Sequence, residues 1–187
     1  MRSTRMNTKA LHPNTLTLLS AWERISAAPG DKSLGPRTSQ HPDIIECLFV
    51  IERRSEGVWS FRNVGERMSN LLGRDLAEHD YLNFWTGHDR EMITAFLAGV
   101  HESRQPGIVR ANGETLTGER IDIEMTLAPL HSSKARPGCQ RLLGLYQTLH
   151  GADVLKGRPV WRHRVTAIFP PDMRAEPPRL RLVTSND

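Results

Sequence analysis

The apolar positions near the N-terminus recur every three or four residues, which is the spacing of one helical face. They are Leu18, Leu19, Trp22 and Ile25. Asn14 suits a helix N-cap, Pro29 and Gly30 end the helix, and the polar segment 31–42 is typical of a linker. We therefore expect region 1–42 to be an amphipathic helix and a linker. The four apolar residues should form an interface, with the sheet of the same chain or with a second copy.

Beyond residue 42 the pattern alternates between the period of a strand and the period of a helix. Gly73 suits the left-handed residue that closes a helix, and Thr86 suits an N-cap, with Asp89 three residues later. In chain order the patterns predict strands at 44–52 and 58–62, helical or irregular segments at 64–72 and 76–85, a longer helix between Thr86 and Gln105, and strands at 108–111, 121–127 and 142–149. Region 43–150 is therefore expected to be one α+β domain.

Two carboxylates on the most regular strand are expected to face solvent. Asp122 and Glu124 alternate with the apolar residues of segment 121–127, so they should point away from the core. Region 151–187 contains five of the twelve prolines and no strong period. We expect it to be a basic tail that is dispensable for folding, with at most one short strand near 165–169.

Four short motifs in this order resemble the PAS domain, in particular a compact subgroup found as small stand-alone proteins in alphaproteobacteria. The motifs are W-S-F-R-N-V-G at 59–65, L-L-G-R-D-L at 71–76, Y-L-N-F-W at 81–85 and D-R at 89–90. The resemblance covers residues 20–149. It implies a five-stranded antiparallel sheet with short helices and one longer helix on one face, in addition to the N-terminal helix.

The resemblance also implies a cavity between sheet and helices, which in some PAS domains holds a small ligand and in others is filled by side chains. The residues expected to line it are Trp59, Phe61, Arg62, Met68, Leu72, Arg74, Phe84, Trp85, Phe96, Leu97, Ile123 and Met125. Because this set is rich in bulky side chains, we favour a filled core. Arg62 and Arg74 could bind an anionic ligand, although structural ion pairs, for example of Arg74 with Asp75 or Asp89, are the preferred interpretation.

The sequence shows no catalytic motif and no metal site. There is no G-x-S-x-G nucleophile and no glycine-rich phosphate loop, and Cys47 and Cys139 lack the spacing of a zinc or redox pair. No cofactor is expected. Haem held by His88 or His101, which lie on the longer helix, is kept as a minor alternative.

Composition and charge point to a soluble chain of the cytoplasm. Charged residues make up 25% of the sequence, no apolar run approaches the roughly 20 residues that cross a bilayer, and the first residues lack the apolar core of a secretory signal. The net charge is only +4, and many basic residues lie after position 150. This distribution leaves a nucleic-acid-binding tail as a weaker alternative.

We therefore interpret the chain as a non-enzymatic bacterial sensor or adaptor, a homodimer that regulates a partner protein such as a kinase through protein–protein contact. A rival from another class is an enzyme or carrier with a cone-shaped α+β fold, in which a curved sheet encloses an apolar pocket. A nucleic-acid binder is the third alternative.

Overall fold

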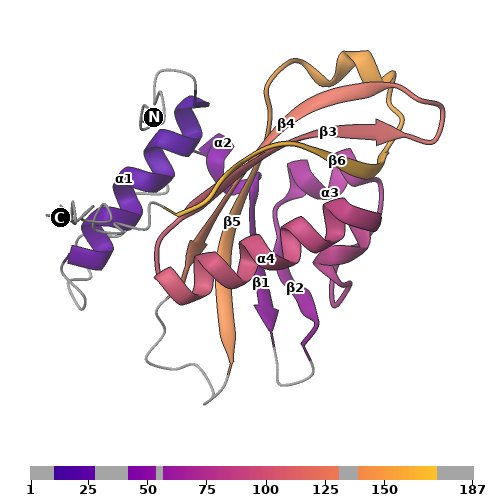
Figure 1. The fold of residues 1–187 in the computed structure, drawn as a ribbon. Helices are drawn as coiled ribbons and strands as arrows, with labels where there is room; N and C mark the ends of the chain where they lie inside the picture. Colours follow the sequence, from indigo (N-terminus) through magenta and orange to yellow (C-terminus); the bar gives the residue numbers. More distant parts are fainter. Residues whose placement is uncertain (1–10, 28–41, 54–56, 131–138, 172–187) are drawn as a thin grey trace, which may run out of the picture.

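The computed structural model describes residues 11–27, 42–53, 57–130 and 139–171. Within these residues six strands form one antiparallel sheet in the order β2-β1-β5-β4-β3-β6 (Figure 1). The strands are β1 (Leu48–Arg53), β2 (Trp59–Val64), β3 (Gly107–Thr115), β4 (Arg120–Pro129), β5 (Gln140–Thr148) and β6 (Val160–Phe169).

The helices of the described residues lie before the first strand and between later strands. They are α1 (Pro13–Ala27), α2 (Pro42–Ile45), α3 (Glu66–Leu72), the 3₁₀ helix η4 (Tyr81–Phe84), α4 (Gly87–Ser103) and the 3₁₀ helix η5 (Ala152–Leu155). Gly73 ends α3 with a φ of 62°, the left-handed conformation expected there. Asp80 caps η4, because its carboxylate accepts a hydrogen bond from the Leu82 backbone N–H. None of these helices is long and apolar enough to cross a membrane.

The main core lies between one face of the sheet and helices α3, η4 and α4. Ile121, Ile123, Met125 and Leu127 of β4 all belong to it, because side chains two residues apart share a face. The close fit is clearest where Gly144 of β5 faces the ring of Phe49: an added Cβ would lie 2.0 Å from that ring. The ten apolar residues predicted to line the cavity are all buried in this core.

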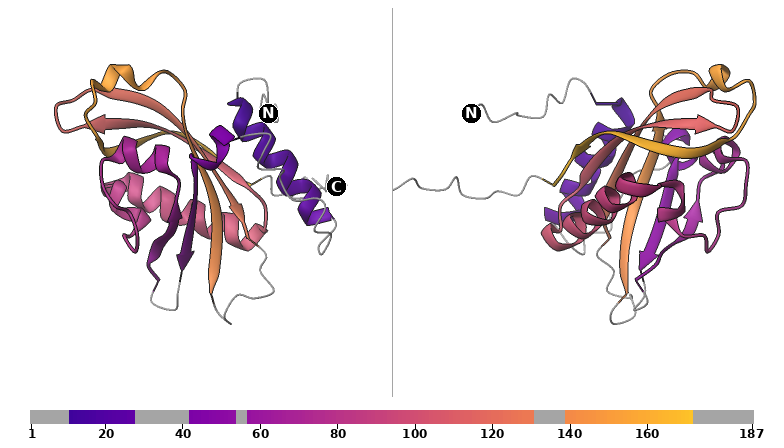
Figure 2. Two further views of the ribbon diagram at one scale, coloured as in Figure 1. Left: turned by 180° about the vertical axis from the view of Figure 1, so that it is seen from behind. Right: turned by 45° about the vertical axis from the view of Figure 1, so that its right-hand side comes forward.

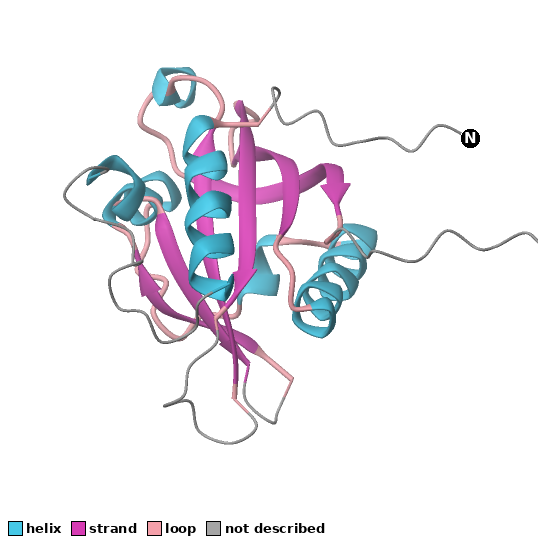
Figure 3. Ribbon diagram, turned by 90° about the vertical axis from the view of Figure 1, so that its left-hand side faces the viewer, coloured by secondary structure: helices cyan, strands magenta, loops and turns pink. Residues whose placement is uncertain are grey.

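Helix α1 packs on the opposite face of the sheet. It contacts β4 and β5, and Leu18 joins Ile44, Cys47 and Leu145 in a second, smaller apolar cluster. Figure 2 shows α1 lying apart from α3 and α4, and Figure 3 shows strands between α1 and α4. The sheet of this chain therefore covers part of the apolar side of α1, which was one of the two arrangements expected for it.

Polar contacts also attach α1 to strand β4. The backbone N–H of His12, the residue before α1, donates to Oε1 of Glu124 at 2.9 Å, and the indole N–H of Trp22 donates to the carbonyl of Pro129 at 3.1 Å. The hydroxyls of Thr15 and Thr126 lie 3.3 Å apart. Glu124 is completely buried and pairs with Arg110 at 2.8 Å. The prediction that Glu124 is solvated was wrong because α1 covers this part of the face, whereas Asp122 is half exposed.

The structure differs from the predicted elements at two places. Residues 42–45 form the helix α2 instead of the beginning of a strand, and β1 begins only at Leu48. The sheet has a sixth strand, β6, so it extends beyond the expected boundary at residue 150. Two irregularities in the pairing of β6 with β3 disturb its alternation, and Val160 and His163 are buried three residues apart. This strand therefore has no clear period of two.

Candidate functional site

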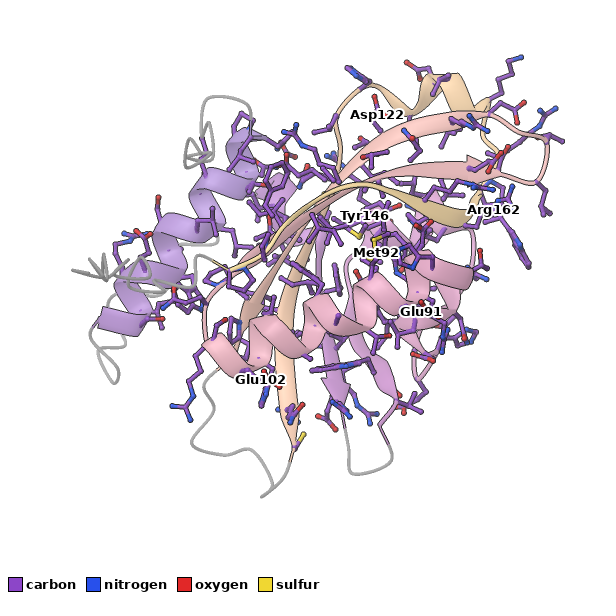
Figure 4. All side chains as sticks on the ribbon, viewed as in Figure 1. Glu91, Met92, Glu102, Asp122, Tyr146 and Arg162 are labelled. Atoms are coloured by element: carbon purple, nitrogen blue, oxygen red, sulfur yellow. The ribbon has the colours of Figure 1, made fainter. Side chains whose placement is uncertain are left out.

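Six side chains form an aromatic and polar group that extends from the buried core to the exposed Trp161, and we call it the His163 cluster. Its members are Arg74, Phe84, Trp85, Tyr146, Trp161 and His163. They come from the segment after α3, from η4 and its C-cap, from β5 and from β6. Figure 4 shows Tyr146 between α4 and the sheet, while Asp122 lies at the outside of the molecule.

His163 lies at the centre of this cluster and is 2% exposed. Its Nε2 lies 2.7 Å from the hydroxyl of Tyr146. Its ring centroid is 5.3 Å from that of Phe84 and 5.2 Å from that of Trp85. The pairing of β6 with β3 sets His163 opposite Gly113, where an added Cβ would lie 2.5 Å from Ile123 and 2.9 Å from Val160. An imidazole is thus held among aromatic rings on an otherwise apolar face.

Burial fixes the protonation of the two hydrogen-bonded partners. Burial, with a smaller contribution from the charge of Arg74, lowers the pKa of His163 to about 3. Burial also raises the pKa of Tyr146 well above its ordinary value, and Tyr81 adds to this shift. At neutral pH the imidazole is therefore neutral and the phenol protonated. When Tyr146 donates its O–H to Nε2, the ring proton of His163 is on Nδ1.

Three nitrogens in the cluster have no hydrogen-bond partner within the described part of the chain. They are Nε of Arg74, Nε1 of Trp85 and Nδ1 of His163, and all three atoms are buried. Leaving a buried donor without a partner costs about 1–3 kcal/mol. The concentration of three such atoms in one group distinguishes it from the rest of the core, which is largely apolar.

Arg74 lies between two aromatic rings. Its guanidinium carbon is 4.7 Å from the centroid of Phe84 and 5.2 Å from that of Trp161. The expected ion pair with Asp75 or Asp89 does not form. Asp75 instead accepts from the backbone N–H of Ala77 at 2.9 Å, and Asp89 from that of Val165 at 3.4 Å. Among the described residues Arg74 has no ion-pair partner, and desolvation lowers its pKa.

Arg62 is in a different place from the one predicted. It follows Phe61 on β2 and therefore lies on the outer face of the sheet, where it pairs with Glu52 at 3.4 Å and with Glu78. Arg141 of β5 pairs with the same Glu52 at 2.7 Å. The structural ion pair, the preferred interpretation for this arginine, is thus present, and Arg62 does not line the interior.

The two histidines considered for haem lie outside the core cluster. His88 has a side chain that is 79% exposed and 3.3 Å from Glu91, and His101 is half-buried near the end of α4. His163 was missed by the sequence analysis because segment 151–187 lacks a clear period and was interpreted as a tail. The apolar residues Val160, Val165, Ile168 and Phe169 indicate a strand here, but they do not point to a buried histidine.

The polar and reactive side chains around the cluster are few among the described residues. The described hydrogen bond of His163 leads to the phenol of Tyr146. Cys47 lies in the outer cluster, and burial raises the pKa of its thiol. Within the described residues no group of three or more His, Cys, Asp or Glu side chains could hold a metal ion. The arrangement is suited to binding, by means of donors and aromatic surfaces.

An antiparallel sheet with helices α3, η4 and α4 over one face, α1 on the other, and a partly buried polar cluster under the first face defines a small α+β domain that can hold a site. A family model described as the PAS domain matches residues 10–147, and the chain belongs to this family of sensory domains. The cone-shaped alternative fold was therefore wrong. Domains of this family are generally not enzymes. The match ends before β6, which supplies Trp161 and His163.

Several solved structures are similar to this chain. The PAS domain of a protein from Colwellia psychrerythraea has 13% identity and a TM-score of 0.43, and the match covers 59% of this chain and 95% of that one. The PAS domain of BvgS from Bordetella pertussis has 13% identity and a TM-score of 0.42, over 63% and 89% of the two chains. The N-terminal domain of a diguanylate cyclase with a PAS/PAC sensor from Marinobacter aquaeolei has 13% identity and a TM-score of 0.41, over 55% and 94%. No curated protein matches the sequence.

Proposed function

We propose that this PAS domain is a non-enzymatic bacterial adaptor of the cytoplasm that regulates a partner protein, such as a kinase, by direct contact. The observation that supports the proposal most is the position of β5 between the His163 cluster and helix α1. Tyr146 faces the cluster, and the preceding residue, Leu145, faces α1 in the outer apolar cluster. A change in the position of Tyr146 would therefore be transmitted to the surface under α1.

Strand β4 provides a second connection of the same kind. Met125 points into the core, where its sulfur lies 3.5 Å from the hydroxyl of Tyr81. The next residue, Thr126, is on the outer face and lies 3.3 Å from Thr15 of α1. Two adjacent strands thus each carry one residue toward the interior and its neighbour toward α1. Energetic coupling between two sites is carried by packed side chains and secondary-structure elements that connect them.

The outer side of α1 is the surface that we assign to the partner. Ile25 is 44% exposed and Leu16 is 37% exposed, whereas Leu18 is buried against the sheet. Leu19 and Trp22 are half-buried. Of the four apolar residues predicted to form an interface, Ile25 is the one most available to another molecule. A second copy of the chain would use the same surface in the proposed homodimer.

The nucleic-acid alternative has less support from the described residues. Arg158 pairs with Glu119, and Arg162 lies 2.9 Å from Glu114, which also pairs with Arg120, so both arginines already have an acidic partner. Arg174, Arg179 and Arg181 lie outside the described residues.

The experiment compares two substitutions that put a charge on equally exposed apolar residues. Ile25→Glu alters α1, and Val58→Glu, at a residue that is 45% exposed just before β2, is the matched control. Tagged full-length chains are expressed at native level in the original host, cross-linked and captured. We expect the wild type and Val58→Glu to retain the same stoichiometric regulatory protein and Ile25→Glu to lose it.

Retention of the same protein by all three chains would contradict the assignment to α1. Capture of no stoichiometric partner by any chain would contradict the adaptor function. Light scattering of the same purified chains tests the homodimer: we expect a dimer for the wild type and Val58→Glu and a monomer for Ile25→Glu, and equal masses for all three would contradict this interface.

A further inference from the structure

We propose that the His163 cluster binds a small organic carboxylate, with the carboxylate group on Arg74 and its body against Trp161. The inference rests on the proposed sensory function and adds the chemical class of the ligand to it. It follows from the charge, the unpaired donors and the aromatic surfaces of the cluster.

The cluster carries one positive charge, that of Arg74, which a bound negative group would neutralise. Arg74 is the cation of the cluster, and His163 is neutral at neutral pH because burial lowers its pKa. The neighbouring carboxylates of Asp75 and Asp89 accept hydrogen bonds from backbone N–H groups and form no ion pair with the guanidinium. A partly buried arginine without a counter-ion among the described residues is energetically costly, and a bound monoanion would remove this cost.

The unpaired atoms of the cluster are hydrogen-bond donors, so a ligand that accepts hydrogen bonds would satisfy them. The indole of Trp85 can only donate, and Nε of Arg74 can only donate. When Tyr146 donates to Nε2 of His163, Nδ1 of that ring is a third donor. A carboxylate has two oxygens that only accept and a planar shape that matches the planar fork of a guanidinium.

The aromatic surfaces favour a ligand with an apolar body over a bare inorganic anion. Phe84 and Trp161 lie on the guanidinium, and Trp161 is 52% exposed, so this side of the cluster opens to solvent. A guanidinium pairs with phosphate as well as with carboxylate, but inorganic phosphate has no apolar body that could use these aromatic surfaces. We therefore use benzoate as the probe, with benzamide as its neutral analogue and inorganic phosphate as the alternative anion.

Titration of the full chain with benzoate, followed by ¹⁵N NMR, tests the inference directly. The indole N–H signal of Trp85, assigned with Trp85→Phe, should move progressively and reach saturation. The signal of Trp22, whose indole N–H donates to Pro129 on the far face, should not move. We expect benzamide and phosphate to cause no saturable shift at the same concentrations. Absence of a saturable Trp85 shift with benzoate overturns the proposal, as does equal binding of benzamide or binding of phosphate alone.

Substitution of the arginine identifies the binding group. Arg74→Gln should weaken benzoate binding at least about tenfold, because a hydrogen bond to a charged group is lost. Arg74→Lys keeps the charge without the planar fork and should bind with intermediate affinity, which also covers the case that the glutamine variant does not fold. Arg67→Gln on α3 is the control, since Arg67 is 55% exposed and pairs with Glu46. Equal affinities of the wild type and folded Arg74 variants contradict the proposal.

The result is independent of the capture experiment described above. Benzoate binding without a captured partner would keep the ligand and overturn the adaptor function. If the partner is lost only with Ile25→Glu and benzoate does not bind, the adaptor function stands and the carboxylate site is overturned.

Discussion

Burial of His163 in the core makes the free energy of unfolding depend on pH. Its folded pKa of about 3 lies below the usual value of 6.5, because burial disfavours the charged ring. As the pH falls from about 6.5 toward 3, the unfolded chain takes up a proton that the folded chain does not, so the free energy of unfolding decreases. The neutral groups around the ring, Tyr81 and Tyr146, do not titrate in this range, because burial raises both pKa values.

The prediction is a loss of about 2 kcal/mol of stability between pH 6.5 and 4.5 that depends on His163. The lowered pKa values of Glu114 and Glu119 act mainly below 4.5 and so do not obscure this window. Urea unfolding of the wild type, His163→Gln and the exposed control His88→Gln measures it. We expect His163→Gln to flatten the dependence and His88→Gln to preserve it. An unchanged pH dependence in His163→Gln would contradict the position of this ring.

Two carboxylates on one face of β4 differ in burial, so we predict that their removal has different effects on stability. Glu124 is completely buried beneath α1 and paired with Arg110, whereas Asp122 is 50% exposed. Glu124→Ala should lower the free energy of unfolding by about 2–4 kcal/mol, because a buried charge pair is broken. Asp122→Ala should lower it by less than about 1 kcal/mol. Denaturant unfolding of both variants checks this, and similar costs would show that α1 does not cover Glu124.

The sequence was informative about individual apolar residues and less so about polar ones. The spacing of Met68, Leu72, Phe96 and Leu97 indicated the core correctly. Glu124 could not be recognised as buried, since its alternation with apolar neighbours defines only the face and not what covers it. The absence of an ion pair at Arg74 could not be seen either, because nearness in sequence to Asp75 does not decide where a side chain points.

At the scale of elements, β6 shows why the domain boundary was placed too early. Its pairing with β3 contains two register shifts, so its buried residues do not alternate regularly. One of those residues is His163, a polar type that a search for apolar alternation overlooks. The hairpin β1–β2, the helix ending at Gly73 and the regular strand β4 were all predicted, because in each of them local pattern and tertiary position agree.

Because β6 pairs with β3 in the sheet, we predict that this strand is required for folding, whereas the sequence suggested a dispensable tail. A chain ending at Gly151 loses Leu155, Val160 and His163 from the core and leaves the edge of β3 unpaired. A chain ending at Pro171 keeps every described contact of β6. We expect cooperative thermal unfolding from the second chain and its loss in the first. A chain ending at Gly151 with the melting temperature of the longer one would show that β6 does not belong to the fold.

The docking of helix α1 on the sheet can be monitored by the reactivity of Cys47, which lies beneath the helix. Cys47 is 2% exposed in the outer apolar cluster together with Leu18, and its thiol pKa is raised by burial. In a Cys139→Ser background, Leu18→Asp should release α1 from the sheet and increase the rate of Cys47 modification by a thiol reagent at least about tenfold. Ile25→Asp on the exposed side of the same helix is the control and should leave the rate low. Equal rates in all three chains would contradict the docking of α1.

The whole molecule combines the region matched by the PAS family with a further strand, β6. The PAS match ends at residue 147, and β6 then places Trp161 and His163 beside Arg74, Phe84 and Trp85. The interior of the domain therefore contains donors contributed from inside and outside the matched region. Strands β4 and β5 separate this interior from α1, and each of them contacts both sides.

Hydrogen exchange of the full chain, followed by mass spectrometry with and without benzoate, tests this coupling most directly. We expect slower exchange in the peptides that contain Tyr81–Phe84 and Val160–His163, together with a change in exchange of α1, Pro13–Ala27. The peptide containing Glu66–Asn70 should be unaffected, and Arg74→Gln should abolish all the changes. Protection at the cluster with no change in α1 would contradict the transmission of a signal through β4 and β5.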